Sequence, residues 1–257
     1  MSDNTDNTVY LITGSNKGIG LSLVSHLLAR PNTTVLALYR ATSPPPNPFS
    51  SLLPPSHPSS TLIPLPLPTI PPSSTASLAS LLPSSITHID VVISNAGGTS
   101  GFNSIADTSA QDMLYDFTLN AVGMADLFRV AWPLLEKSER EVKKFVVISS
   151  SVGSIKGLGE ENFPAAAYGM SKAAANWWGR KLALDYKGKG LGVGILHPGW
   201  VRTGMGKGIA EAIGLEEEAA PMMTADESAR ALLEQIDNLT LENSGQFKSY
   251  NGKTLPW

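Results

Sequence analysis

The chain contains no cysteine among its 257 residues, and only 16% of its residues are charged. The absence of cysteine excludes disulfide scaffolds and zinc folds that use cysteine ligands, and we expect no bound metal ion. Lys and Arg number 19 against 22 Asp and Glu, which gives a net charge of -3 without a block of basic residues. The sequence therefore lacks the basic patch of a nucleic-acid-binding protein, and we expect no nucleic-acid partner.

Long apolar runs and a basic, apolar leader are also missing. The chain starts with the polar and acidic segment Met1 to Asp6, and it contains no uninterrupted apolar stretch of about 18 residues. We therefore expect a cytoplasmic protein that does not associate with a membrane.

Short apolar runs alternate with longer helical patterns along the chain, which is typical of βαβ units on a parallel sheet. The strands are predicted at 9–12, 34–39, 62–67, 90–94, 144–149, 192–196 and about 246–250. The helices are predicted at about 18–30, 74–82, 109–138, 165–187 and 224–238. We predict one α/β domain over residues 1–257, a Rossmann-type doubly wound parallel sheet of about seven strands with helices on both faces.

One stretch has an unusual composition, because residues 41–89 contain no Asp, Glu, Lys or Arg. Within it, the uncharged segment 41–72 is rich in proline. A domain boundary here would leave an N-terminal piece too short to fold alone. We interpret 41–72 as an excursion within the domain, with the usual helix reduced to a short turn near residues 47–53.

The prolines at positions 64, 66 and 68 alternate in a way that a strand can accommodate. Residues two apart direct their N–H groups to the same side, so all three missing donors can face away from the neighbouring strand. This requires an edge strand, and the third strand is the edge in a doubly wound sheet of order 3-2-1-4-5-6.

A glycine-rich turn follows the first predicted strand and precedes a helical pattern. Residues 13–20 read T-G-S-N-K-G-I-G. Gly14 permits a tight turn, Gly18 lets the backbone approach a pyrophosphate, and Gly20 allows the helix to pack closely on the strand. A glycine triplet alone is weak evidence, because loops are rich in glycine, but its place between a strand and a helix favours a dinucleotide site.

The second predicted strand ends in Tyr39-Arg40, where an NAD site would carry Asp or Glu to bind the ribose 2′-hydroxyl. Arg40 suits a 2′-phosphate instead, and Lys17 in the glycine turn adds a second positive charge. Each could be a solvated surface cation on its own. Together, and without the acidic residue, they favour NADP(H) over NAD(H).

Tyr168 and Lys172 are four residues apart, which places both on one face of a helix. A nearby ammonium stabilises a phenolate and lowers its pKa, so the pair could move a proton to or from a carbonyl or alcohol oxygen. The Y-x-x-x-K spacing alone is common on helices. Ser149, Ser150 and Ser151 add weight, because they end a buried strand at the edge where open α/β sheets bind ligands.

Taken in order, the motifs of the chain resemble those of the short-chain dehydrogenase/reductase family over nearly its whole length. The matching motifs are the glycine turn, Asn95-Ala96-Gly97, Asn120, Ser150, Tyr168 with Lys172, and His197-Pro198-Gly199. Within the family, the glycine turn is similar to that of carbonyl reductases. Residues 197–203 and 245–257 are similar to the branch of sniffer and the fungal norsolorinic acid ketoreductases.

The resemblance implies a role for each matching residue. Tyr168 would protonate a carbonyl oxygen, Lys172 would lower the pKa of Tyr168 and hold the nicotinamide ribose, and Ser150 would hydrogen-bond the developing alkoxide. Ser150 is chosen over its neighbours because it precedes Gly153 by three residues, as in the family. Asn120 would anchor a water behind Lys172. The positions that would bind NADP(H) are Gly14, Asn16, Lys17, Gly18, Ile19, Gly20, Arg40, Asn95, Ala96, Gly97, Tyr168, Lys172, Pro198, Gly199, Val201 and Thr203.

The resemblance further implies a homodimer or homotetramer formed through the helices at 109–138 and 165–187. Trp177 and Trp178 on the second of these are expected in the core or a subunit interface. His197 is expected to pack and hydrogen-bond, not to act as a base.

Three positions depart from the family pattern. Residues 65–67, Leu-Pro-Leu, replace an aspartate beside the adenine, so that contact would be lost. The loop 151–167 is longer than usual, and Phe163 in it could line a pocket. Gly204 replaces an aspartate after Thr203, which should loosen a substrate lid over 200–223.

The expected walls of the substrate site are dominated by small and apolar residues, and we interpret Arg202 and Lys207 as surface charges. The function predicted is NADPH-dependent reduction of an uncharged, fairly apolar ketone or aldehyde, with aromatic or polycyclic secondary metabolites among the candidates. Two alternatives stay open: a binding, regulatory or non-redox protein that keeps NADP as a structural ligand, and NAD(P)-dependent alcohol oxidation. The sequence barely separates carbonyl detoxification from biosynthesis, although the enlarged loop favours the latter.

Overall fold

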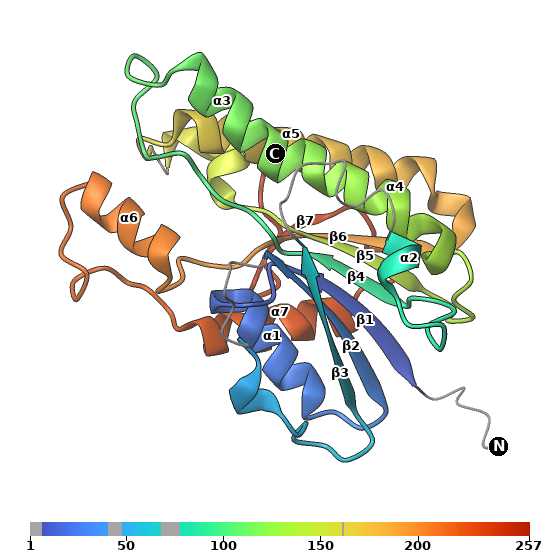
Figure 1. Ribbon diagram of the computed structural model, residues 1–257. Helices are drawn as coiled ribbons and strands as arrows, with labels where there is room; N and C mark the ends of the chain where they lie inside the picture. The colour runs from blue at the N-terminus through green and yellow to red at the C-terminus, as the bar shows by residue number, and fades with distance from the viewer. Residues whose placement is uncertain (1–6, 41–47, 68–77, 161) are drawn as a thin grey trace.

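The computed structural model describes residues 7–40, 48–67, 78–160 and 162–257. They form a seven-stranded sheet in the order β3-β2-β1-β4-β5-β6-β7, in which every neighbouring pair is parallel. Helices cover both faces of the sheet (Figure 1). The predicted doubly wound α/β fold is confirmed.

The central strands are buried on both faces, as their continuous apolar runs predict. The strands are β1 (Thr8–Thr13), β2 (Thr33–Arg40), β3 (Thr61–Leu67), β4 (Val91–Ser94), β5 (Lys143–Ile148), β6 (Leu191–His197) and β7 (Phe247–Ser249). The strand order reverses between β1 and β4, because β2 and β3 lie on one side of β1 and the later strands on the other. The carboxyl ends of β1 and β4 therefore form the switch point where such sheets bind ligands.

The helices form two layers, each packed on its own apolar core. On one face α1 (Gly18–Leu28) contacts α7 (Ala225–Asp237), and on the other α3 (Ala110–Phe117) contacts α5 (Ala166–Asp185) (Figure 1). A capping box starts α7, since Thr224 and Glu227 bond each other's backbone N–H groups. The short helical segments are η1 (Ser50–Leu52), α2 (Leu78–Leu81), η4 (Ser151–Gly153), η5 (Lys156–Gly159) and η6 (Lys187–Lys189).

The helix predicted over 109–138 is interrupted. After α3, the π-helical turn η3 (Thr118–Val122) leads into α4 (Gly123–Leu135). The N–H of Gly123 bonds to the carbonyl of Thr118, five residues earlier. Apolar periodicity does not reveal such a turn, and π turns are frequent at functional sites; here the turn carries Asn120.

A helix that the sequence did not predict, α6 (Gly204–Ala212), lies within the expected lid. Its first five residues include three glycines, which lower helix propensity and conceal it from pattern analysis. The hydroxyl of Thr203 caps it by accepting the N–H of Gly206 at 3.3 Å.

The proline-rich segment behaves as predicted where the structure describes it. β3 ends the sheet, and Pro64 and Pro66 lie opposite Ala37 and Tyr39 of β2. Within its described residues, 48–60, the connection from β2 contains the short turn η1 and no longer helix. Pro68 and the start of the helix predicted at 74–82 lie outside the described residues.

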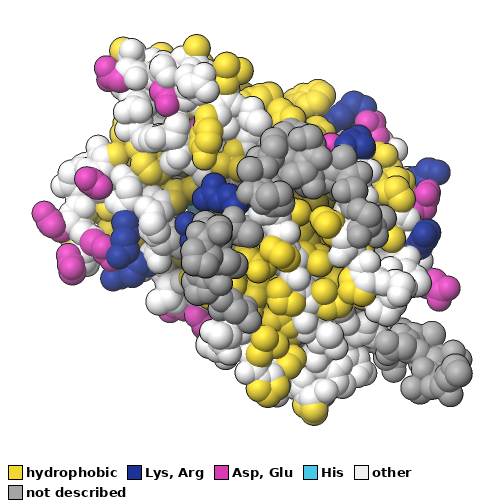
Figure 2. All heavy atoms as spheres, viewed as in Figure 1, with side chains coloured by type: hydrophobic (Ala, Val, Ile, Leu, Met, Phe, Trp, Pro, Cys, Tyr) yellow, Lys and Arg dark blue, Asp and Glu magenta, His cyan; other side chains and the backbone are white. Residues whose placement is uncertain are grey.

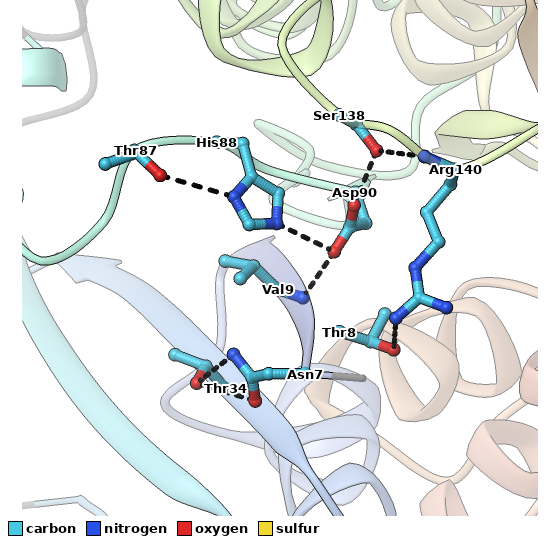
Figure 3. Close-up of polar contacts among 9 residues, drawn as sticks. All are labelled: Asn7, Thr8, Val9, Thr34, Thr87, His88, Asp90, Ser138 and Arg140. Carbon is cyan, nitrogen blue, oxygen red and sulfur yellow. Dashed lines mark hydrogen bonds and ion pairs between the residues drawn. The ribbon is translucent and has the colours of Figure 1, made fainter. Parts of the chain in front are cut away.

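The amino-terminal ends of the strands are joined by a buried carboxylate, Asp90 (Figure 3). One of its oxygens accepts the N–H of Val9 at 2.8 Å and lies 3.4 Å from Nε2 of His88, and the other accepts the hydroxyl of Ser138 at 2.5 Å. These contacts fix β1 and β4 at the end of the sheet opposite the switch point.

Candidate active site

The glycine turn between β1 and α1 is shaped by close backbone packing. Gly14 and Gly18 have φ angles of +65° and +54°, which glycine adopts without strain. A Cβ on Gly20 would lie 2.2 Å from the carbonyl oxygen of Gly14, so only glycine fits there. Lys17 is the N-cap of α1 but makes no side-chain capping bond. The first N–H groups of α1 therefore remain available for phosphate oxygens.

The glycine turn is tied to β2, because the amide and the hydroxyl of Ser15 both donate to the carbonyl of Leu38, at 3.2 and 2.9 Å. Arg40 ends this strand, and both Arg40 and Lys17 are exposed. Neither makes an ion pair with another described residue. Figure 2 shows a small group of Lys and Arg side chains in the middle of one face, while acidic side chains lie nearer its margins.

Asn95 and Ala96 fasten the end of β4 to the end of β1. The side-chain amide of Asn95 donates to the carbonyls of Thr13 and Gly14, at 2.9 and 3.1 Å. The amides of Asn95 and Ala96 both donate to the hydroxyl of Thr13. The Asn95 side chain thus holds the glycine turn in shape, and its contact with a cofactor stays a prediction.

An apolar hollow adjoins the turn on the side of β2 and β3. Its walls include Leu38, Tyr39, Leu67, Leu119 and Met124. Leu67 stands near the position where the family's aspartate was expected beside the adenine. The hollow offers apolar contact to a flat ring but no carboxylate among its described walls.

Gly97 brings two other motifs together. A Cβ on this residue would lie 2.9 Å from Oδ1 of Asn120 and 3.4 Å from Nζ of Lys172. Asn120 holds the next residue, Gly98, through two bonds: its oxygen accepts the Gly98 N–H at 3.0 Å, and its amide donates to the Gly98 carbonyl at 2.8 Å. The predicted water site behind Lys172 stays a prediction.

Tyr168 and Lys172 lie one turn apart on α5 and both are buried. The ammonium of Lys172 donates to the carbonyl of Ile148 at 2.9 Å and lies 5.6 Å from the centre of the Tyr168 ring. A Cβ on Gly153 would lie 2.7 Å from the backbone of Lys172, so this glycine lets the loop after β5 pack on α5. The loop in turn sets Ser150 within hydrogen-bond reach of Tyr168.

Burial dominates the pKa values of the pair. It raises the pKa of Tyr168 to about 12, against which the hydrogen bond with Ser150 acts to lower it. It lowers the pKa of Lys172 to about 8, while the charge of Asp116 acts to raise it. The expectation that Lys172 holds the pKa of Tyr168 below its usual value is wrong for this arrangement, because burial disfavours the charged phenolate and outweighs the hydrogen bond with Ser150. In the protein without ligand, Tyr168 is a phenol that can give a proton.

His197 behaves as predicted. Its Nδ1 accepts the backbone N–H of Ser151 at 3.1 Å, and burial lowers its pKa to about 4. The ring is therefore neutral near pH 7, and its role is to join the ends of β5 and β6.

A mainly apolar cavity opens above Ser150 and Tyr168. Phe163 lines it, as predicted, and its ring lies 6.1 Å from that of Trp200 in an edge-to-face arrangement. Met205 and Ile209 of α6 close another side. The predicted residues that share this cavity are Ile19, Ser150, Tyr168, His197, Pro198, Gly199, Val201 and Thr203.

The basic residues of the lid do not line the cavity. Arg202 and Lys207 both face Glu217, with nitrogen–oxygen distances of 3.8 and 3.0 Å. Their interpretation as surface charges agrees with this pairing.

Phe102 is a site residue that the sequence did not reveal. Its ring lies 6.4 Å from that of Tyr168, and a Cβ on Gly208 of α6 would lie 3.0 Å from it. Phe102 therefore sits between Tyr168 and the lid helix. It stands in an irregular loop, where no periodicity marks it.

Comparison with known proteins identifies the class. The family model of short chain dehydrogenases matches residues 8–214. A short-chain dehydrogenase of Penicillium aethiopicum is 37% identical, with 96% of this chain and 98% of the relative covered. The chain belongs to the short-chain dehydrogenase family.

Two further similarities lie within this family. Norsolorinic acid ketoreductase of Dothistroma septosporum is 34% identical, with 97% of this chain and 92% of the relative covered. The crystal structure of NADPH-bound carbonyl reductase from chicken fatty liver is 31% identical, with a TM-score of 0.83 and coverage of 98% and 99% of the two chains. The resemblance read from the motifs is confirmed, and the protein is an oxidoreductase of this family.

Within the described ranges, no helix combines the length and the apolar character needed to cross a membrane.

Proposed function

We propose that this protein reduces an uncharged, largely apolar ketone or aldehyde to an alcohol, with NADPH as the hydride donor. One observation carries the proposal: the phenol of Tyr168, paired with Ser150 and adjacent to Lys172, lies at the edge of an apolar cavity next to the switch point of the sheet. A phenol in that place can protonate a carbonyl oxygen that the cavity holds.

The residues around the glycine turn fit a phosphorylated dinucleotide. The N-terminus of α1 has no side-chain cap, so its first N–H groups can bind a diphosphate. The close packing of Gly20 on Gly14 holds the glycine turn against this helix end. Arg40 and Lys17 supply positive charge without a described acidic partner, which suits a 2′-phosphate. The NADPH-bound carbonyl reductase from chicken supports the same cofactor.

Once bound, the dinucleotide would supply a hydride to the carbonyl carbon. Tyr168 would give its proton to the carbonyl oxygen, so hydride and proton together make the alcohol. Ser150 would hydrogen-bond the same oxygen as negative charge develops on it. Lys172, when protonated, would stabilise the phenolate that Tyr168 becomes and would help to draw a replacement proton from solvent.

The cavity walls favour an uncharged, largely apolar substrate. Phe163 and Trp200 present aromatic surface, Met205 and Ile209 add apolar contacts, and no charged side chain lines the cavity among the described residues. Such walls suit a flat, uncharged ring system. The norsolorinic acid ketoreductase among the relatives supports an aromatic ketone.

Binding and turnover with NADPH and NADH test the proposal. We expect selective binding of NADPH in a fluorescence titration, and loss of NADPH absorbance with aromatic or polycyclic ketones. Tyr168→Phe should still bind NADPH and should lose turnover. Binding without turnover on any carbonyl would favour the non-redox alternative, and turnover only from alcohol with NAD(P)⁺ would favour oxidation.

We also propose that the protein forms a homo-oligomer through α3 and α5. Several large apolar side chains on these helices are exposed, among them Leu114, Tyr115, Met170 and Trp177. Trp178, by contrast, packs against the core. Light scattering on the purified protein would measure its mass, and a monomer at every concentration would contradict the proposal.

A further inference from the structure

Asp116, in the last turn of α3, is a carboxylate that is completely buried. The described residues place no Lys, Arg or His within ion-pair distance of it. Burying a charge without a direct cation costs free energy, so such a group is uncommon in a protein interior. The reaction steps described above do not use it.

The contacts of Asp116 are with the loop that follows β4. One oxygen accepts the backbone N–H of Ser100 at 2.7 Å, and the other accepts the hydroxyl of Thr99 at 2.9 Å. Asn120, four residues later, holds Gly98 in the same loop. The two side chains thus fix three successive residues of the loop against the helix.

This loop touches the reacting groups at both of its ends. Gly97, before the fixed residues, lies beside Lys172, and Phe102, after them, packs on the ring of Tyr168. A shift of the loop would therefore move the surroundings of both groups.

The charge of Asp116 also reaches the pair on α5. The groups that face Lys172 are Tyr168 on its own helix, Asn120 from η3 and the carbonyl of Ile148 from β5. His197, at the end of β6, is neutral at neutral pH because its pKa is about 4. Burial lowers the pKa of Lys172, and the negative charge of Asp116 acts against this change.

We propose that Asp116 is a positioning residue of the reductase, which fixes the loop at Thr99 and Ser100 and so holds the surroundings of Lys172 and Tyr168 that this loop supplies. The proposal rests on the reductase activity proposed above. It assigns two separable effects to one side chain: hydrogen bonds that hold the loop, and a charge that acts on Lys172.

Two variants separate these effects. Asp116→Asn removes the charge and keeps an oxygen that can accept the N–H of Ser100. Thr99→Val keeps the charge of Asp116 and the shape of the side chain, but removes the hydroxyl and with it the hydrogen bond to Asp116 and the two contacts with the backbone of Gly101. In the protein without cofactor, NMR of lysine labelled with carbon-13 at the ε position follows the titration of Lys172, and Lys172→Met assigns the signal.

The expected results differ between the variants. In Asp116→Asn, Lys172 should titrate at a lower pH than in the original protein. As the pH is raised, kcat/KM for carbonyl reduction should therefore begin to fall at a lower pH than in the original protein. In Thr99→Val, Lys172 should titrate as in the original protein. KM should rise by up to about tenfold, because the loop is held less firmly. A merely structural role would not move the Lys172 titration.

An unchanged Lys172 titration and an unchanged pH profile in Asp116→Asn would overturn the proposal. A shifted Lys172 titration in a protein that reduces no carbonyl would instead contradict the reductase activity and leave the charge effect established. Circular dichroism verifies the fold of each variant. If Asp116→Asn does not fold, Asp116→Ser, which leaves room for water, takes its place in both measurements.

Discussion

The backbone amide of Ser151 donates a hydrogen bond to Nδ1 of His197 at 3.1 Å and joins the loop that carries Ser150 to the carboxyl end of β6. Because an amide can only donate, this bond requires an unprotonated Nδ1. Protonation of the ring would break the contact and place a charge in a buried position.

The first prediction concerns stability in acid. The pKa of His197 is about 4 in the folded protein, below the ordinary value of 6.5, so the unfolded chain takes up a proton first as pH falls. The contribution of the neutral His197 ring to the free energy of unfolding is therefore complete above pH 6.5, and it is lost progressively as the pH falls toward 4. His197→Gln, which can still accept the Ser151 N–H, should lack this loss. Urea unfolding at several pH values measures it, and parallel pH dependence in both proteins would refute the assignment.

The second prediction concerns the glycine turn. Gly20→Ala places a Cβ 2.2 Å from the carbonyl oxygen of Gly14, so α1 must move away from β1. We expect the free energy of unfolding to fall by about 1–3 kcal/mol and NADPH binding to weaken. Gly159→Ala is the control, since a Cβ there meets nothing within 4 Å. Equal stability of the two variants would contradict the close packing.

The third prediction concerns cofactor choice. Arg40→Ala and Lys17→Ala should each raise the Kd for NADPH by about tenfold, because a charged hydrogen bond to phosphate is lost. The Kd for NADH should change little. Lys187→Ala, which removes an exposed cation that precedes the amino-terminal end of β6, is the control. If both cofactors weaken equally, the two cations act on something other than the 2′-phosphate.

The fourth prediction concerns the lid. Gly204→Asp puts a carboxylate in the first turn of α6, where the helix dipole favours it by about 0.3–1 kcal/mol, and a Cβ at this position meets nothing within 4 Å. Amide exchange of α6 should slow, and kcat should fall if lid opening limits turnover. Gly204→Ala separates the gain in helix propensity from the effect of charge. Exchange that is as fast as before would show that Gly204 does not loosen the lid.

The fifth prediction concerns the cavity wall. Phe163→Ala removes the ring that contacts Trp200, so KM for an aromatic ketone should rise by about tenfold while NADPH binding stays unchanged. Leu158→Ala in the same loop is the matched control, because Leu158 is largely exposed. An equal effect of both variants would indicate a general disturbance of the loop.

The strands and the sheet order could be predicted from the sequence because local chemistry and topology agree there. The apolar runs mark buried strands, and the prolines at 64 and 66 allow β3 only at an edge. The π turn at Asn120 and helix α6 could not be predicted. Asn120 contacts Gly98 in a distant segment, which no local pattern reveals, and the glycines at the start of α6 lower its helix propensity.

The residues proposed for catalysis could be located from the sequence because each belongs to a motif with fixed spacing. Their electrostatics could not, because the pKa of Tyr168 depends on burial, which no spacing reveals. Asp116 and Phe102 were missed for a related reason: their importance comes from neighbours that the fold supplies, Thr99 with Ser100 and Tyr168.

The prolines of β3 have a consequence for how these molecules behave at high concentration. Residues 64 and 66 turn away from β2, so the outer side of the sheet presents carbonyl oxygens there without N–H groups. An incoming strand from a second molecule would find acceptors whose complementary donors are missing, and a continuous ladder could not form. This arrangement disfavours edge-to-edge strand pairing along β3, which is the route to aggregation that an open sheet edge offers.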